Sequence, residues 1–306
     1  MKKTEKKISF DKLLLYDMFY KNNIQYISDL HLEHLKMLPY IKRAANNLCL
    51  LGDIGSPRTQ IYKDFIRDCS IKFKNVFVIY GNHEYHSVKT RLEPKVIETM
   101  ETIEKHALDF SKNVYFLNNS CVYLDTVTDI VTNYPVNNNS VKIIGSTLWA
   151  ATKDYKLNDY KKIFVTETQK LTPEISTQMF QRNIDYILRE IRSEPRVRCI
   201  LMTHHGTNVV CNGASKHKDF DNDTSYVTHV QELLNCENLV ACLNGHTHSS
   251  IDEEVVGENG NIIRFLANCY GYIAEDQTIV KYNPYASFNV PATPMISYPV
   301  LTEHMR

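Results

Sequence analysis

The chain has 306 residues, of which 43% are hydrophobic, and its 35 basic residues (Lys and Arg) balance 35 acidic ones (Asp and Glu). A chain of this length can bury a core that needs no disulfide or structural metal. The zero formal charge excludes the global basic field that drives non-specific nucleic-acid binding. No apolar run approaches the roughly 20 residues of a membrane span, so we expect no membrane partner.

Residues 1–20 begin with basic residues, as a signal peptide does. Asp11, Lys12 and Asp17 interrupt the apolar stretch, and no small-residue cleavage site follows. We predict a solvated tail and an amphipathic helix instead. None of the eight cysteines forms a C-x-x-C pair, which argues against a zinc cluster or redox motif. We interpret them as buried thiols in a reducing compartment, and we expect a cytoplasmic protein.

Short apolar runs of strand length alternate with helical patterns, and this alternation predicts an α/β fold. The runs are near-continuously apolar, which is typical of strands that are covered on both faces. The predicted strands are 24–27, 48–51, 76–80, 141–144, 199–202, 239–243 and 262–266. The predicted helices are 56–72, with Ser56 as N-cap and Pro57 in the first turn, 91–110, 172–192 and 224–234.

Two long polar connections stand between these elements. Residues 121–140 are interpreted as a strand followed by an exposed loop, and residues 206–223 as a binding loop or lid. No repeat or composition shift divides the chain. The expected organisation is therefore a tail and helix at 1–20, one domain at 21–282, and a Pro-rich extension at 283–306 that runs extended over the domain surface.

Five predicted strands end in residue types that bind metal ions. In open α/β sheets, sites form at the carboxyl ends of strands, so these residues are expected on one rim. Two Asp, one Asn and at least four His, without Cys, suit Mn²⁺, Fe or Zn²⁺. The set exceeds what one ion with an open position requires, so we predict two ions that share a carboxylate. The segments are Asp29-Leu30-His31, Gly52-Asp53, Gly81-Asn82-His83-Glu84, His204-His205-Gly206 and Gly245-His246-Thr247-His248.

Three glycines support this interpretation. Gly52, Gly81 and Gly245 each precede a presumed ligand, where the backbone must turn sharply or approach a metal closely. Each motif alone is a weak signal, because an Asp-x-His is expected by composition about once in a chain of this kind. The five together, in this order and each after an apolar run, are specific.

The ordered pattern D-x-H, G-D, G-N-H-E, H and G-H-x-H, from Asp29 to His248, resembles the calcineurin-like metallophosphoesterase superfamily. The segment Ile-Gly-Ser-Thr-Leu-Trp at 144–149 is similar to small single-domain microbial members. The resemblance implies a four-layer αββα sandwich of two mixed β-sheets flanked by helices. It also implies a di-metal phosphoesterase in which an activated hydroxide attacks phosphorus in line.

The resemblance also implies individual roles. Adjacent side chains point in different directions, so one of the two neighbouring histidines is expected to bind metal, and the resemblance favours His204. His205 would then either support a ligand from behind or face the substrate. Apart from the resemblance, the planar donor fork of Arg58 could bind a substrate phosphate, and Trp149 could form a pocket wall because it ends a strand on the same rim; the alternatives are a solvated first-turn arginine and a core tryptophan. His83 would protonate the leaving group. Asp29, His31, Asp53 and His248 would hold the first ion, with Asp53 bridging, and Asn82, His204 and His246 would complete the second.

Departures from the superfamily's patterns narrow the function. The segment after Asp53 lacks the Asp and Arg of the protein Ser/Thr phosphatases, Ser56 replaces the Tyr of purple acid phosphatases, and Asp29 replaces the Cys of lariat-debranching enzymes. What remains is the bacterial-type group of phosphodiesterases and phosphatases. We expect a small-molecule phosphoester or nucleotide as substrate. A nuclease and a non-catalytic scaffold with this fold remain alternatives.

Overall fold

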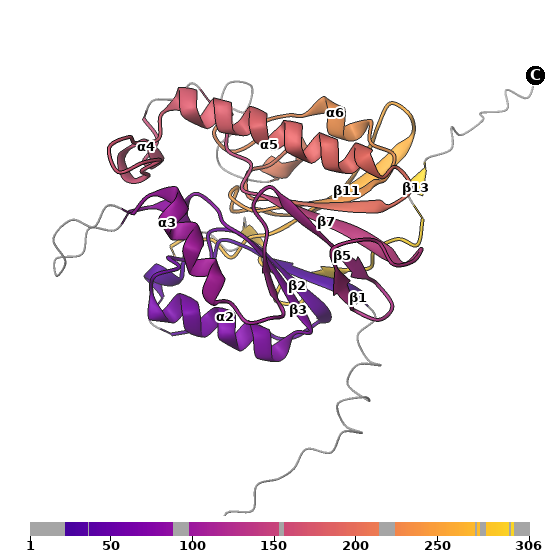
Figure 1. The fold of residues 1–306 in the computed structure, drawn as a ribbon, viewed down its shortest axis with the longest axis horizontal. Coiled ribbons are helices and arrows are strands. Elements are labelled where there is room, and N and C mark those ends of the chain that lie inside the picture. The colour runs from indigo at the N-terminus through magenta and orange to yellow at the C-terminus, as the bar shows by residue number, and fades with distance from the viewer. Residues whose placement is uncertain are drawn as a thin grey trace, which may run out of the picture.

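A computed structural model describes residues 22–35, 37–87, 98–152, 156–213, 224–272, 274–275, 280–293 and 295–296. Two mixed sheets face each other, and helices cover the outer face of each (Figure 1). This is the predicted four-layer αββα sandwich. The helix expected within residues 1–20 lies outside the described residues, as does the first part of the helix expected at 91–110.

The first sheet has five strands in the order β12-β1-β2-β3-β4. The pairs among β1 to β4 are parallel, and β12 pairs antiparallel with β1. Parallel neighbours bring the carboxyl ends of β1, β2 and β3 to one rim. The strands are β1 (Asn22–Ile27), β2 (Ala45–Leu51), β3 (Asn75–Ile79), β4 (Val114–Phe116) and β12 (Ser287–Phe288).

The second sheet has eight strands. Seven follow the order β10-β11-β9-β8-β7-β5-β6, and β13 pairs with β11 beside this path. The central strands β7, β8, β9 and β11 are parallel, and the flanking pairs are antiparallel. The strands are β5 (Ser120–Asp125), β6 (Val131–Thr132), β7 (Ser140–Ser146), β8 (Arg198–Thr203), β9 (Leu239–Asn244), β10 (Ser250–Val256), β11 (Asn261–Asn268) and β13 (Met295–Ile296).

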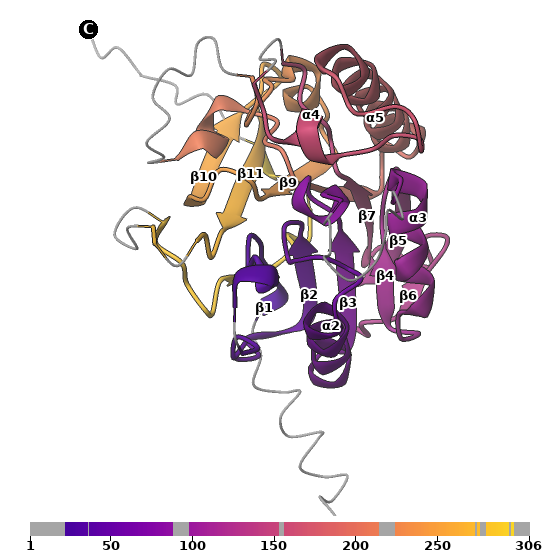
Figure 2. The same ribbon diagram turned by 90° about the vertical axis from the view of Figure 1, so that its left-hand side faces the viewer.

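Helices form the two outer layers. Views at right angles agree that α2 lies against the first sheet and α5 against the second (Figures 1 and 2). The α-helices are α2 (Gln60–Lys72), α3 (Met100–Glu104), α4 (Asp159–Lys162), α5 (Pro173–Ser193) and α6 (Gln231–Leu234). The 3₁₀ turns are η1 (Leu32–His34), η2 (His83–Tyr85), η3 (Lys105–Asp109) and η4 (Val209–Asn212).

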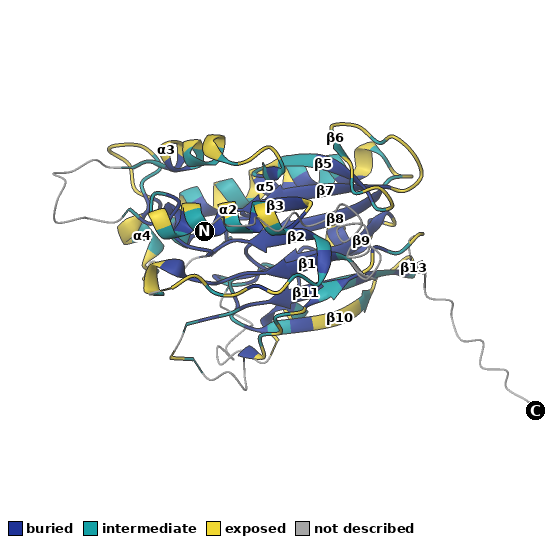
Figure 3. Ribbon diagram, turned by 90° about the horizontal axis from the view of Figure 1, so that it is seen from below, coloured by how far each residue is buried: buried dark blue, intermediate teal, exposed yellow. Residues whose placement is uncertain are grey.

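The core explains why the strands lack polar alternation. Along β2, Leu48 and Leu50 face the helices while Cys49 and Leu51 face the other sheet, and both sets are buried. The same division holds along β8. Because both faces of a central strand are covered, every position can be apolar. Figure 3 shows the buried strands between helices whose outer sides are exposed.

Three of the predicted helices are shorter or interrupted in the structure. α2 begins at Gln60 rather than at 56, because the Thr59 hydroxyl accepts the N–H of Tyr62 and caps the helix there. The helix predicted at 224–234 is wrong before Gln231. Backbone bonds join residues 226–230 to Gly206 and Thr207 and replace helical bonds. Within 98–110 the helix is interrupted, because α3 passes into the 3₁₀ turn η3.

The C-terminal extension contributes strands instead of only running over the surface. β12 pairs with β1, and Phe288 and Val290 are buried between the two sheets. β13 pairs with β11. All eight cysteines are free thiols, seven of them buried and Cys121 partly exposed. Among the described residues, no helix has the length and apolar character needed to cross a membrane.

Candidate metal centre

The residues with metal-binding side chains lie where strands of both sheets end. Asp29, Asp53 and Asn82 follow β1, β2 and β3 of the first sheet. His204 follows β8, and His246 follows β9, in the second sheet. Backbone bonds tie these loops together: the His31 N–H donates to the Asp53 carbonyl over 3.0 Å, and the Gly245 N–H donates to the His204 carbonyl over 3.0 Å. The structure therefore brings all seven expected ligands to one rim.

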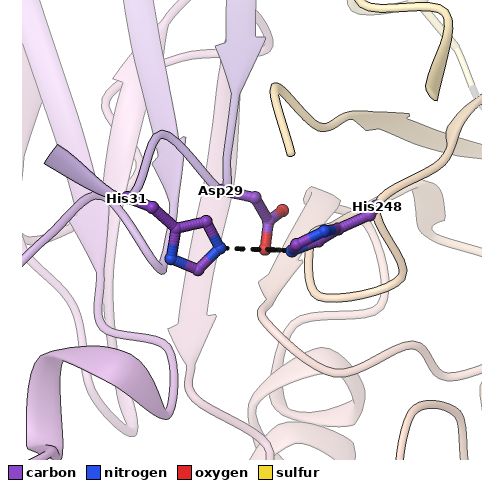
Figure 4. A group of neighbouring side chains, drawn as sticks. All are labelled: Asp29, His31 and His248. Atoms are coloured by element: carbon purple, nitrogen blue, oxygen red, sulfur yellow. Dashed lines mark hydrogen bonds and ion pairs between the residues drawn. The ribbon is translucent and has the colours of Figure 1, made fainter. Parts of the chain in front are cut away.

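Asp29, His31 and His248 form the first group of converging side chains (Figure 4). Nε2 of His248 lies 3.5 Å from the Asp29 Oδ1 and 3.2 Å from the His31 Nε2. Asp29 is completely buried. Burial raises the pKa of its carboxyl, but the hydrogen bond and charge of His248 lower this pKa to about 2. The carboxylate is therefore the stable form in this group.

Asp53, His204 and His246 form the second group, and Asn82 adjoins it. Nε2 of His204 lies 3.3 Å from the Asp53 Oδ1 and 3.0 Å from the Asn82 Oδ1. Burial, followed by the neighbouring His205 and His204, lowers the pKa of His246 well below its usual value. His246 is thus neutral, which is the form that binds metals.

The donor set fits cations. Nδ1 of His204 lies 2.8 Å from the Leu51 carbonyl and donates to it, so the lone pair of a neutral His204 points from Nε2 at two oxygen acceptors. In the metal-free chain a proton takes this place: burial lowers the pKa of His204, but the Asp53 carboxylate raises it to about 9. Two oxygens and a ring nitrogen around a position that needs positive charge suit Mn²⁺, Fe or Zn²⁺.

The backbone at these loops is unusual. Of the nine described non-glycine residues with positive φ, five are Asp29, His31, Asp53, His246 and His248. Such conformations cost free energy and cluster at functional sites. Gly52 supplies a further turn with φ of 84°, whereas Gly81 allows close approach: a Cβ there would lie 2.2 Å from the Asp53 Oδ1.

His83 lies beside both groups. Its backbone N–H donates to the Asp53 Oδ1 over 2.8 Å, and its Nδ1 lies 3.5 Å from the Glu33 Oε1. Its Nε2 is 3.4 Å from the Tyr272 hydroxyl and 4.0 Å from the Asp53 Oδ2. Burial acts to lower the pKa of His83, but Asp53 and Glu33 raise it to about 9. His83 therefore holds a proton at neutral pH. His31, Glu33 and His83 themselves form a third group of potential ligands.

The three residues expected to contact substrate take other positions. Trp149 is buried in the core beneath the first sheet and packs on Tyr85, with ring centroids 5.5 Å apart. Arg58 pairs with Glu98 and donates to the His86 carbonyl. The His205 ring is buried 4.2 Å from that of His246. These side chains are not among the described residues that line the cavity over the metal groups.

That cavity has a volume of about 370 Å³. Asp53, Asn82, His83, His246 and His248 form part of its wall. Thr247, within the G-H-x-H motif, also lines it. The other described wall residues lie outside the motifs, and none of them is among the residues predicted to bind metal or substrate. They are His34, His86, Leu157, Asn158, Asp159, Lys162, Ser225, Tyr226, Tyr272 and Glu275.

Glu84 belongs to the G-N-H-E motif, but the motif does not indicate which groups its carboxylate contacts. Its carboxylate accepts the backbone N–H groups of Asp53 over 2.9 Å, Ile54 over 2.8 Å, Gly55 over 3.4 Å and Gly81 over 2.8 Å. It thereby joins the loops after β2 and β3. Burial and the Asp53 charge raise the pKa of Glu84.

Comparisons with known proteins agree with this geometry. The chain is 28% identical over 295 residues to an uncharacterized protein of Acanthamoeba polyphaga mimivirus, covering 87% of this chain and 96% of the relative. It superposes on the crystal structure of the phosphopantetheinyl hydrolase of Mycobacterium tuberculosis with a TM-score of 0.56 and 16% identity, covering 82% of this chain and 89% of that one. The family model for calcineurin-like phosphoesterases matches residues 23–250. The chain therefore belongs to the calcineurin-like phosphoesterase family of metal-dependent phosphoester hydrolases.

Proposed function

We propose that this protein hydrolyses small phosphoric esters or nucleotides with two divalent cations, Mn²⁺ being preferred and Fe or Zn²⁺ the alternatives. The observation that carries the proposal is the arrangement of His204, Asp53 and Asn82, in which a ring nitrogen and two side-chain oxygens converge on a position that requires positive charge. The first group repeats this pattern with two imidazoles and one carboxylate. We assign Asp29, His31, Asp53 and His248 to one ion, and Asp53, Asn82, His204 and His246 to the other.

When bound, the two cations would offset charge on the phosphoryl oxygens and lower the pKa of a water molecule. The chain itself supplies the proton donor. His83 lines the cavity, and Glu33 lies on its Nδ1 side, so the Nε2 proton is the one available to a departing oxygen. General-acid help of this kind typically contributes about 10²–10⁴-fold. Burial lowers the pKa of His83, but Glu33 acts with Asp53 to raise it in the metal-free chain, and Glu33 is not assigned to either ion, so its contact supports a protonated donor.

The cavity supports a small substrate. Tyr226 and Tyr272 both lie in its wall, and their rings are 5.0 Å from His246 and 4.3 Å from His31. A volume of about 370 Å³ falls within the range of small-molecule sites. We infer that diesters are hydrolysed at least as well as monoesters, since the protein-phosphatase pattern is absent after Asp53. The eight free thiols support a cytoplasmic location.

Metal stoichiometry and a substrate panel test the proposal. After loading with Mn²⁺ or Zn²⁺ and dialysis, elemental analysis should approach two ions per chain. The loaded protein should hydrolyse an aryl diester, an aryl monoester or a cyclic nucleotide. An oligonucleotide in the same panel tests the nuclease alternative, and no turnover of any substrate would favour the non-catalytic scaffold. Turnover of monoesters alone would refute the diester preference and leave the hydrolase proposal intact.

The Asp53→Asn variant should lose both ions and all activities, because it removes the shared negative ligand. Asp252→Asn removes the same charge from an exposed pair with Arg264 and serves as the matched control. Saturation of the folded wild-type protein at one ion or none would contradict the two-metal proposal.

A further inference from the structure

Two carboxylates outside the five motifs contact side chains of the candidate metal centre. Asp159 is the first residue of α4, in the connection between β7 and α5. Glu275 lies beyond the end of β11. Neither belongs to the ligand groups, yet both line the cavity. Their contacts indicate what they do there.

Asp159 fixes the direction of the Asn82 side chain. Nδ2 of Asn82 donates to both oxygens of Asp159, over 3.0 and 3.2 Å. His86 adds a second donor, with its Nε2 2.7 Å from the Asp159 Oδ1. The Asp159 side chain is only 13% exposed, so water competes weakly for these bonds. Asp159 is therefore held by two donors from the loop after β3.

This contact selects which end of the amide faces the second group. An ionised carboxylate only accepts hydrogen bonds, so it can face the NH₂ end of Asn82 and not the oxygen. The Oδ1 must then point to the other side, where it lies 3.0 Å from the His204 Nε2. Without Asp159 the amide can rotate and present its NH₂ group, which cannot bind a cation.

Glu275 holds the other group in a comparable way. Both of its oxygens accept from Nδ1 of His248, over 2.9 and 2.8 Å, and one also accepts the backbone N–H of Tyr272 over 2.9 Å. With its proton on Nδ1, His248 directs the Nε2 lone pair at Asp29 and His31. Partners of this kind fix the tautomer and orientation of metal-binding histidines.

We propose that Asp159 and Glu275 are positioning residues that act on different ions: Asp159 supports the second ion through Asn82, and Glu275 supports the first through His248. The inference rests on the proposed two-metal function. The loss of such a support typically lowers metal affinity about 10–100-fold. Replacement of either residue by Ala should therefore lower the affinity for one ion by about this factor and leave the affinity for the other ion within about threefold of the wild-type value.

Calorimetric titration of the metal-free protein with Mn²⁺ measures both binding constants. Asn82→Ala and His248→Ala identify which constant belongs to which group. Asp159→Ala should lower the same binding constant that Asn82→Ala lowers. Glu275→Ala should lower the same binding constant that His248→Ala lowers. Asp185→Ala is the matched control, because this exposed carboxylate also accepts from a side-chain amide, that of Gln181, over 2.8 Å. Unchanged constants in both variants, or an equal loss of both ions in each, would overturn the proposal.

An exchange of the two side-chain types separates positioning from general damage to the fold. Asp159→Asn keeps one acceptor oxygen but places an NH₂ group where the second oxygen accepted from Asn82, and should weaken the binding of the second ion. Adding Asn82→Asp restores a donor–acceptor pair with the roles reversed, and we expect the double variant to recover at least tenfold of the lost affinity. A double variant weaker than Asp159→Asn alone would contradict the positioning role of Asp159.

A measurement without metal distinguishes this inference from the proposed function. In the metal-free protein, the side-chain NH₂ protons of Asn82 should exchange slowly with solvent by NMR, and quickly in Asp159→Ala. Fewer than two ions bound to the wild-type protein would refute the two-metal function, even if these protons behave as expected. Equal exchange in the two proteins would refute the role of Asp159, whatever the metal content.

Discussion

Gly81→Ala is the sharpest single test of how the second metal group is built. An added Cβ would lie 2.2 Å from the Asp53 Oδ1 and 2.6 Å from both Cε1 and Nε2 of His204. Carbon–oxygen contacts begin at about 3.3 Å, so Asp53 would have to move by about 1 Å. Metal–ligand distances tolerate only about 0.2 Å. We expect Gly81→Ala to lose at least one ion and about 10²-fold or more in activity, the usual cost of a 1 Å misplacement.

Gly257→Ala is the matched control. Its Cβ would lie 2.0 Å from the Leu234 carbonyl oxygen and 2.3 Å from the Asn261 Oδ1, a contact as tight but far from the metal-binding side chains. Overpacking typically costs about 1–3 kcal/mol, so both variants should lose stability by this amount in urea unfolding followed by circular dichroism. Only Gly81→Ala should lose metal by elemental analysis. Two ions bound by Gly81→Ala with wild-type affinity would refute the reasoning, and equal metal loss in Gly257→Ala would show that destabilisation alone is the cause.

Three other predictions follow from the same geometry. His83→Ala should keep both ions but slow the hydrolysis of alkyl or nucleoside esters far more than that of nitrophenyl esters, whose leaving group needs no proton; equal losses in kcat would exclude a general acid. Burial lowers the pKa values of His204 and His248, but Asp53 raises the first to about 9, and hydrogen bonds to Asp29 and Glu275 raise the second to about 10. Both rings are therefore protonated below these values in the metal-free protein and must release protons to bind cations, so calorimetric affinity for Mn²⁺ should rise with pH up to about 9; a flat profile would contradict this. Glu84→Ala leaves four backbone N–H groups without their acceptor and should lower the free energy of unfolding by about 3–5 kcal/mol; a urea midpoint equal to that of the wild type would refute this.

Sequence patterns alone predicted the central strands β1, β2, β3, β7, β8, β9 and β11 and the set of metal-binding residue types. They did not predict the strands β4, β6, β10, β12 and β13. Strands that are buried on both faces appear in the sequence as continuous apolar runs. Metal-binding residues directly follow several of these runs, as Gly52 and Asp53 follow Leu51. These are local signals, because a strand's burial and the residue that follows it are encoded in adjacent positions. The pattern from Asp29 to His248 also identified the family, since five ordered motifs seldom coincide by chance.

The tertiary structure decided which partners those residues meet. α6 begins later than the sequence pattern predicts, because residues before it form backbone hydrogen bonds to Gly206 and Thr207 instead of helical ones. Arg58 forms an ion pair with Glu98, and Trp149 packs in the core. The local sequence around these two residues specifies neither contact. Asp159 contacts Asn82 from 77 residues away, in a short helix with no motif. Contacts of this kind form because the two sheets bring their loops together in space. A local sequence pattern does not specify which distant loops become neighbours.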